Sequence, residues 1–179
     1  EVNKTYFPNL TPLRGLAALL VVIYHVDVLV GGGGMLLPYN SGLVYRQYLM
    51  VDLFFVLSGF IIFHVYGPWF IERITWDSFR RFVRARFARI YPLHVLMLFV
   101  MMGILWLAGA AGLKEEPALE IRNNWFSVIT NLLLIHSMNV HDWFTWVHPS
   151  WSISTEWWMY MLFPMLVIPF GKFGRIGGM

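Results

Sequence analysis

Residues 90–113 read IYPLHVLMLFVMMGILWLAGAAGL, a run of 24 residues that contains no Asp, Glu, Lys or Arg. A helix needs ~20 consecutive apolar residues to cross the hydrocarbon core of a bilayer. Because lipid offers no hydrogen-bond partners, such a segment must satisfy its own backbone polar groups, which a helix does. The run therefore predicts a membrane-spanning helix with Pro92 and His94 in its first turn.

Four further apolar segments flank this run along the chain. Three are long, at residues 13–30, 48–66 and 151–170, whereas the one at 125–137 is too short for an upright span. None shows the alternation of ~10-residue strands that a transmembrane barrel would need. We therefore predict an all-α fold, a polytopic integral membrane helical bundle with four to five spans in this chain.

The composition excludes several other classes of protein. Apolar residues make up 58% of the 179 residues and charged residues only 13%, about half the charged share of a soluble domain. These values exclude a disordered chain and argue against a soluble globular domain. The chain has no Cys, which excludes disulfides and thiolate metal sites.

The basic residues predict how the bundle is oriented. Six of the thirteen Lys and Arg residues fall within the loop 67–89, namely Arg73, Arg80, Arg81, Arg84, Arg86 and Arg89. The positive-inside rule places this loop in the cytoplasm. The loops 31–47 and 114–124 are then expected outside. Nucleic acid is not an expected partner, because the basic residues lie against membrane spans.

The direction of the last apolar segment is left open. If residues 125–137 cross the membrane, the segment 151–170 runs outward and Lys172 and Arg175 lie outside. If residues 125–137 are re-entrant, the last segment runs inward and both charges are cytoplasmic. Two charges decide weakly between these alternatives.

Arg14 and His25 lie eleven residues apart in the first apolar segment. At about 100° per residue they share one face of a helix, roughly 16 Å apart along its axis. An ionisable residue within a span is a functional candidate by default. The alternatives are a snorkelling anchor for Arg14 and a helix-packing hydrogen bond for His25.

Two acidic residues are candidate partners for these side chains. Asp52 lies near the outer end of its segment, at about the depth of His25, and could orient that imidazole as a carboxylate orients a general base. An interfacial carboxylate facing water is the alternative. Glu156 would lie level with His25 if its segment runs inward, and level with Arg14 if it runs outward; a structural Arg–Glu pair is its alternative role.

The arginine-rich stretch predicts a basic amphipathic helix on the cytoplasmic surface. Thr75 can cap it, and its apolar side would consist of Trp76, Phe79, Val83 and Phe87, at spacings of three and four. Binding to anionic headgroups is one interpretation of its arginines. A clamp for phosphate groups is the other, with Arg86 and Arg89 best placed just before Pro92 at a helix start.

The histidines of the C-terminal half give no metal-ligand pattern. His136, His141 and His148 are spaced by five and seven residues, which does not bring them together on one helix. We interpret them as loop and interface residues and predict no metal site.

Four stretches of the sequence resemble the acyltransferase 3 family of bacterial membrane O-acyltransferases. They are LTPLRGLAALLVVIYH at 10–25, VDLFFVLSGFII at 51–62, RARFARIYPLH at 84–94 and PSWSISTEWWMYMLFP at 149–164. The first holds the family's Arg-x10-His pattern at Arg14 and His25, and the last resembles its Trp-Ser-Leu-Ser-x-Glu signature, with Ile153 in place of Leu. Met50 stands where a Gly is common.

The resemblance implies the transfer of an acyl group, usually acetyl, from cytoplasmic acyl-CoA to a hydroxyl of a cell-surface glycan or a lipid-linked acceptor. It implies catalytic roles for His25 and Arg14, with Asp52 and Glu156 as further candidates in matched motifs. It also implies that cytoplasmic arginines, here Arg84, Arg86 and Arg89, meet the CoA phosphates. The location implied is the bacterial inner membrane, in contact with lipid.

The resemblance also bears on the extent of the domain. Family domains have about ten spans, so residues 1–179 correspond to an N-terminal portion that we expect to be inactive alone. A transporter or channel subunit is the competing interpretation, because intramembrane Arg, His, Asp and Glu also suit a substrate pathway.

Overall fold

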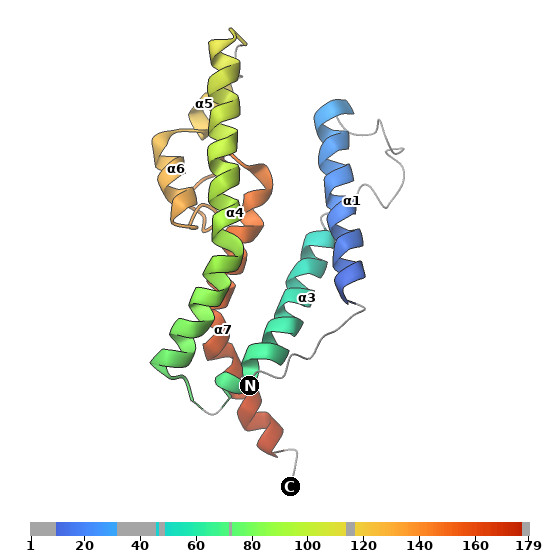
Figure 1. The fold of residues 1–179 in the computed structure, drawn as a ribbon, viewed down its shortest axis with the longest axis vertical. Helices are drawn as coiled ribbons and strands as arrows, with labels where there is room; N and C mark the ends of the chain where they lie inside the picture. The colour runs from blue at the N-terminus through green and yellow to red at the C-terminus, as the bar shows by residue number, and fades with distance from the viewer. Residues whose placement is uncertain (1–9, 32–45, 47–48, 72, 114–116, 177–179) are drawn as a thin grey trace. The chain divides into compact units, whose positions relative to one another are not determined.

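The computed structural model describes residues 10–31, 46, 49–71, 73–113 and 117–176 (Figure 1). Its regular elements are helices: α1 (Leu10–Gly31), α3 (Leu49–Tyr66), the 3₁₀ turn η1 (Gly67–Trp69), α4 (Trp76–Ala110), α5 (Pro117–Arg122), α6 (Trp125–Leu132), the 3₁₀ turn η2 (His148–Ser150) and α7 (Trp151–Ile176). The prediction of an all-α fold is confirmed. Most of loop 31–47 and the first part of loop 114–124 lie outside the described residues.

Three stretches of the described chain are long and apolar enough to cross a membrane: Leu10–Asp27, Leu49–Trp69 and Trp76–Ala110. In each of them only 11% of the window is buried by the rest of the protein. Their apolar side chains therefore remain largely uncovered, as lipid-facing side chains are. The protein is polytopic, and the part of the chain that the structure describes holds three candidate spans, where four to five were expected in the whole chain.

The chain divides into two units, residues 1–68 and 69–179. In the first unit α1 packs against α3. Ala17 and Asp27 are the buried side chains of α1, and Leu57 and Ile62 are those of α3. This packing fixes which face of α1 is covered within the unit.

The second unit is built on α4, a continuous helix of 35 residues. It begins with a capping box, in which the Thr75 hydroxyl accepts a hydrogen bond from the Ser78 amide and the Ser78 hydroxyl accepts one from the Thr75 amide. The helix then runs through Pro92 without interruption. The expected break before Pro92, with a separate helix lying on the surface, is therefore wrong, since a Pro is tolerated inside a membrane helix when neighbouring segments support it.

The covered face of the first turns of α4 also differs from the expected one. Phe82 is fully buried and Arg86 is 9% exposed, whereas Trp76 and Phe87 are 71% and 40% exposed. The reason is tertiary, because aromatic side chains of α7 pack on the face that carries Phe82 and Arg86. Spacing alone could not reveal that partner.

Helix α6 has eight residues and ends at Leu132, so the prediction of helix through residue 137 is wrong for its last part. Two side chains of α4 bind its final carbonyls: Tyr91 donates to the carbonyl of Leu132 at 3.0 Å, and His94 Nε2 lies 3.0 Å from that of Asn131. Left-handed backbone at Leu134 and Asn139 then turns the chain. These contacts place the end of α6 beside the middle of α4.

Helix α7 runs antiparallel to α4 (Figure 1). Its Trp157 meets Phe87 of α4, and Tyr160, further along α7, meets Phe82, which lies earlier on α4. The chain thus reaches α4 at the level of Tyr91 and His94 and returns toward the start of α4. This direction of α7 is the one that the re-entrant alternative for residues 125–137 requires.

Candidate functional site

Arg14 and His25 both lie on the uninterrupted helix α1, so the helical spacing that relates them is present. The imidazole of His25 is partly buried, and its Nδ1 lies 2.8 Å from the carbonyl oxygen of Val21. A carbonyl only accepts, so Nδ1 carries the proton in the neutral ring and Nε2 carries the lone pair. The local backbone thereby selects the tautomer whose ring lone pair is on Nε2.

Asp52 does not join His25 in this unit. Its side chain is exposed on α3, and within the described residues it forms no hydrogen bond or ion pair. The buried acid of the unit is Asp27, which is 1% exposed and lies two residues after His25. Sequence reasoning passed over Asp27, although an Asp inside an apolar segment was the signal that could have identified it.

Glu156 lies at the level of Arg86 rather than toward the outer end of α4. The hydroxyl of Tyr160 donates to Oε1 of Glu156 one turn earlier on α7. The ring of Tyr160 in turn lies below the guanidinium of Arg86, 5.8 Å from its central carbon. The structure therefore brings together two of the predicted site residues, Arg86 and Glu156, through a tyrosine that sequence reasoning did not single out.

Four aromatic rings hold this group in place. Phe82 stacks on Phe163 at 5.4 Å and meets Phe70 and Tyr160 edge-on at 5.6 and 6.1 Å. Phe70, Phe82 and Tyr160 are at most 3% exposed. The buried Arg86–Tyr160 contact is thus flanked by a packed aromatic cluster, which fixes the side chains on both helices.

The other predicted phosphate-binding residues have a different environment. Arg84 and Arg89 are exposed on α4, and so are Arg80 and Arg81. The guanidinium of Arg81 lies 5.7 Å from the centre of the Trp69 ring. The first turns of α4 therefore present a cluster of exposed guanidinium groups, whereas Arg86 points into the α4–α7 contact.

A buried polar network occupies the other end of the α4–α7 contact. Asn131 donates to the carbonyl of Ser127 at 2.7 Å and to the hydroxyl of Thr145 at 2.8 Å. The ring of His94 stacks parallel to that of His136, with centroids 5.6 Å apart. All five side chains are less than 9% exposed. Sequence reasoning missed this network because its members come from two helices, a turn and a loop.

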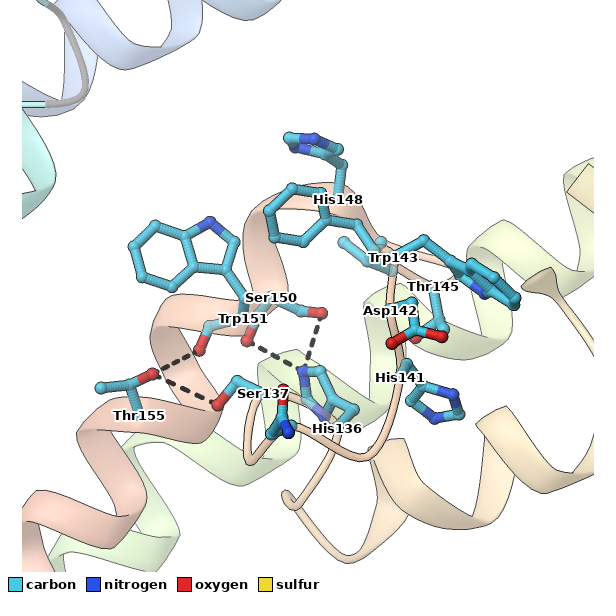
Figure 2. A pocket seen from close by; sticks show the side chains of 13 residues that line it. His136, Ser137, His141, Asp142, Trp143, Thr145, His148, Ser150, Trp151 and Thr155 are labelled. Carbon is cyan, nitrogen blue, oxygen red and sulfur yellow. Dashed lines mark hydrogen bonds between the residues drawn. The ribbon is translucent and has the colours of Figure 1, made fainter. Parts of the chain in front are cut away.

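A polar cavity of about 450 Å³ opens beside this network (Figure 2). It is formed by the loop after α6, by η2 and by the first turn of α7. Its polar side chains include His136, His141, Asp142, Ser150 and Thr155; its aromatic ones are Trp143, Phe144 and Trp151. The histidines interpreted from their spacing as mere loop residues therefore share one cavity.

His136 forms the inner edge of this polar cavity. Its Nε2 lies 3.1 Å from the carbonyl of Ser150 and 3.2 Å from the hydroxyl of the same residue. Burial, with smaller contributions from the nearby His94 and His141, lowers the pKa of His136 to about 4, so the ring is neutral near pH 7. The Ser150 carbonyl requires a donor, which puts the proton on Nε2.

A family model described as an acyltransferase domain matches residues 8–177, nearly the whole chain. The chain belongs to the acyltransferase 3 family. Its four motif stretches all fall within the matched residues, so the resemblance that they carry is confirmed at the level of the family.

Three relatives, two of them with names that describe acyl transfer, illustrate what the chain is similar to. It is 33% identical to "Protein 2 in picA locus" of Rhizobium radiobacter, over 84% of this chain and 76% of that protein. It is 32% identical to "Acyltransferase MdmB" of Streptomyces mycarofaciens, over 88% of this chain and 38% of that protein. It is 25% identical to "Peptidoglycan O-acetyltransferase OatA" of Listeria monocytogenes, over 95% of this chain and 25% of that protein.

The chain thus spans most of the first relative but well under half of the other two. No solved structure matches it significantly. The family assigns the class of chemistry, which is the transfer of an acyl group other than an amino-acyl group.

Proposed function

We propose that this chain is the part of a membrane O-acyltransferase that binds acyl-CoA and carries the catalytic base. The acyl group is acetyl, and the acceptor is a hydroxyl of a cell-surface glycan or a lipid-linked precursor. The observation that carries the proposal is the family match over residues 8–177. Relatives named as peptidoglycan O-acetyltransferases support the choice of acetyl group and glycan.

The proposed location is the cytoplasmic membrane, with residues 67–89 on the cytoplasmic side. The exposed arginines at the start of α4 support this orientation through the positive-inside rule. The direction of α7 adds to this, because Lys172 and Arg175 fall in its last turns, at the same end of the unit as those arginines. Acyl-CoA would therefore approach from the basic end.

Arg84 and Arg89 are the residues that we assign to the phosphates of CoA. Both are exposed, and a guanidinium pairs with two phosphate oxygens at once. Arg86, which lies between them in sequence, is the third proposed phosphate-binding residue, although its buried side chain points into the α4–α7 contact. Its packing against Tyr160 gives it the further task of holding α7, and with it Glu156, in register with α4.

His25 is the proposed general base. Its Nδ1–H contact with Val21 leaves the lone pair on Nε2, which would accept the proton of the acceptor hydroxyl. The acceptor oxygen then attacks the thioester carbonyl carbon, the new C–O bond forms and the C–S bond breaks. The proton passes from His25 to the departing CoA thiolate, so charge and atoms balance. A transient acyl group on His25 is a second route with the same overall balance.

Arg14 is proposed as an essential residue on the same face of α1, roughly three helical turns from His25. This separation excludes direct contact between the two side chains, so Arg14 would bind a different part of the donor. Asp52 is proposed to assist His25, although the two side chains form no hydrogen bond or ion pair with each other among the described residues. That role stands only if Asp52→Asn alters the same pH-dependent step of acyl transfer that His25→Ala alters.

The test uses the full-length protein in proteoliposomes with radiolabelled acetyl-CoA and a hydroxylated acceptor. We expect His25→Ala to lower transfer by ~10²-fold or more, the usual range for loss of a general base. Tyr24→Phe is the matched control, because it keeps the ring that lies edge-on to His25 and removes only a hydroxyl from the same helix. Wild-type transfer by the His25→Ala protein would refute the proposal, as would acceptor flux that requires no acyl-CoA.

A further inference from the structure

The polar cavity beside η2 is chemically unlike the basic end of α4. Among its described lining residues there is no Lys or Arg, and its one carboxylate is Asp142. A site for the phosphates of CoA needs cations. The cavity therefore does not suit the nucleotide end of the donor. The ligand that it suits is one without negative charge.

The hydrogen-bonding pattern of the lining defines that ligand further. Thr130 donates its hydroxyl proton to the carbonyl of Ser127 at 3.0 Å, so at its 2.8 Å contact with His141 it accepts from Nε2–H. The neutral His141 ring then carries its lone pair on Nδ1. Together with the carboxylate of Asp142, the lining offers acceptors, which a ligand bearing several O–H or N–H donors would satisfy.

The aromatic side chains supply the other half of the recognition. Trp143 is 40% exposed and Phe144 is 51% exposed, and both line the cavity with Trp151. Large uncovered aromatic faces beside hydrogen-bonding groups suit an amphipathic ligand with an apolar face and a polar edge. A pyranose ring has this character, with its C–H bonds on one face and hydroxyls around its edge.

The size and position of the cavity agree with this class of ligand. Its volume of about 450 Å³ lies in the range of small-ligand sites. Thr155 in its wall precedes Tyr160, below Arg86, by five residues of α7, or ~7.5 Å along the axis. The cavity therefore lies at the end of α7 opposite the arginines of α4, at the level of His94 in the middle of that helix.

We infer that the cavity lined by His141, Asp142 and Trp143 binds a neutral pyranose unit of the acceptor glycan. This inference rests on the proposed function for its place in the reaction. The binding itself is a property of the cavity and is measurable without acyl-CoA.

The experiment uses the full-length protein in nanodiscs, free of CoA. The probes are methyl β-N-acetylglucosaminide, the β1,4-linked disaccharide of N-acetylglucosamine, and galacturonic acid as a sugar of like size with a negative charge. Saturation-transfer NMR and tryptophan fluorescence report binding. We expect saturable binding of the neutral sugars and at least tenfold weaker binding of galacturonic acid, because Asp142 repels its carboxylate.

Variants separate the cavity from the rest of the surface. Trp143→Ala and Asp142→Ala should each weaken binding by about tenfold. Thr155→Phe, which fills the cavity without removing a polar loop residue, should abolish it. Trp106→Ala is the matched control, since Trp106 is 73% exposed on α4 and lies outside the cavity. Unchanged thermal unfolding of each variant confirms that the fold persists.

The outcomes are distinct. Equal affinities of wild type and all three cavity variants, or no saturable binding of either neutral sugar, would overturn the inference. Sugar binding that the cavity variants abolish, combined with no acyl transfer, would leave the cavity assignment standing and refute the proposed function. If the protein transfers acyl groups and the three variants have the KM of wild type for the acceptor, the cavity assignment is refuted and the proposed function stands.

Discussion

The guanidinium of Arg86 lies over the ring of Tyr160, with 5.8 Å between its central carbon and the ring centroid. This contact joins α4 to α7 at a buried position, since the two side chains are 9% and 3% exposed. A cation over an aromatic face is stabilising, and more so when it is removed from water. The same tyrosine hydroxyl bonds Glu156, so one ring connects a basic and an acidic residue of the matched motifs.

Substitution of Tyr160 should separate the hydrogen bond from the packing. Tyr160→Phe keeps the ring and removes the bond to Glu156, and we expect it to lower the free energy of unfolding by about 1.5–3 kcal/mol. Tyr160→Ala also empties a place in the aromatic cluster and should cost about 3–5 kcal/mol. Thermal unfolding in detergent measures both values, and equal losses for the two variants would contradict the assigned packing.

The helices and spans of this protein were predictable because a run such as 90–113 leaves the backbone no other way to satisfy its polar groups in lipid. The shared helix of Arg14 and His25 followed from the same argument. Which face of α4 is covered did not follow. That face is selected by Tyr160 and Phe163, which lie about eighty residues away in sequence, and local spacing carries no information on such a partner.

The candidate cavity was less predictable than the helices. His136 and His141 meet because the chain turns through left-handed backbone at Leu134 and Asn139, after α6 has ended. Leu134 gives no composition cue for left-handed backbone, and Asn139, a residue type that adopts it more readily, is only a weak cue. A search for ligands at helical spacing therefore could not find a group of side chains that a loop assembles.

The capping box at the start of α4 gives a prediction about stability alone. Thr75→Ala removes the hydroxyl that accepts from the Ser78 amide, and we expect a loss of about 1 kcal/mol in the free energy of unfolding. Thr75→Ser retains the acceptor and should stay close to wild type. Chemical denaturation of the two variants checks this, and a Thr75→Ser protein as unstable as Thr75→Ala would show that the methyl group matters more than the cap.

The two aspartates of the first unit form a matched pair. Asp27 is 1% exposed, whereas Asp52 is exposed. Removal of a buried polar partner leaves another group unsatisfied, so Asp27→Ala should lower the free energy of unfolding by about 1–3 kcal/mol. Asp52→Ala should change it by less than about 0.5 kcal/mol. Thermal unfolding of both purified variants tests the difference, and similar losses would mean that Asp52 is covered in the working protein.

His136 predicts how stability depends on pH. Its pKa is lowered from the ordinary 6.5 to about 4. Between these two pH values the unfolded chain therefore binds a proton at this residue that the folded chain does not bind. The stability therefore falls as the pH drops from about 6.5 to 4, by up to about 3 kcal/mol, and is unaffected by this group above that range.

The measurement compares melting temperatures of wild type and His136→Gln at pH 7.5 and pH 4.5. Glutamine keeps a donor for the Ser150 carbonyl but cannot titrate, so the variant should lose much of the dependence. Changes in other groups are common to both proteins and cancel in the comparison. An identical fall in the melting temperature of the two proteins would assign the pH dependence elsewhere.

The arginines of α4 should divide into two classes. Arg84→Gln and Arg89→Gln remove exposed guanidinium groups, and each should weaken acyl-CoA binding by about three- to tenfold at low salt, with a smaller effect as salt screens the phosphates. Arg86→Gln removes a buried cation from the Tyr160 ring and should lower stability as well as affinity.

Arg122→Gln is the control, because this exposed arginine ends α5, away from the first turns of α4. Calorimetric titration of the full-length protein with acetyl-CoA at two salt concentrations measures the affinities, and thermal unfolding measures the stability. If Arg122→Gln weakens binding as much as Arg89→Gln, the phosphates do not bind at the start of α4.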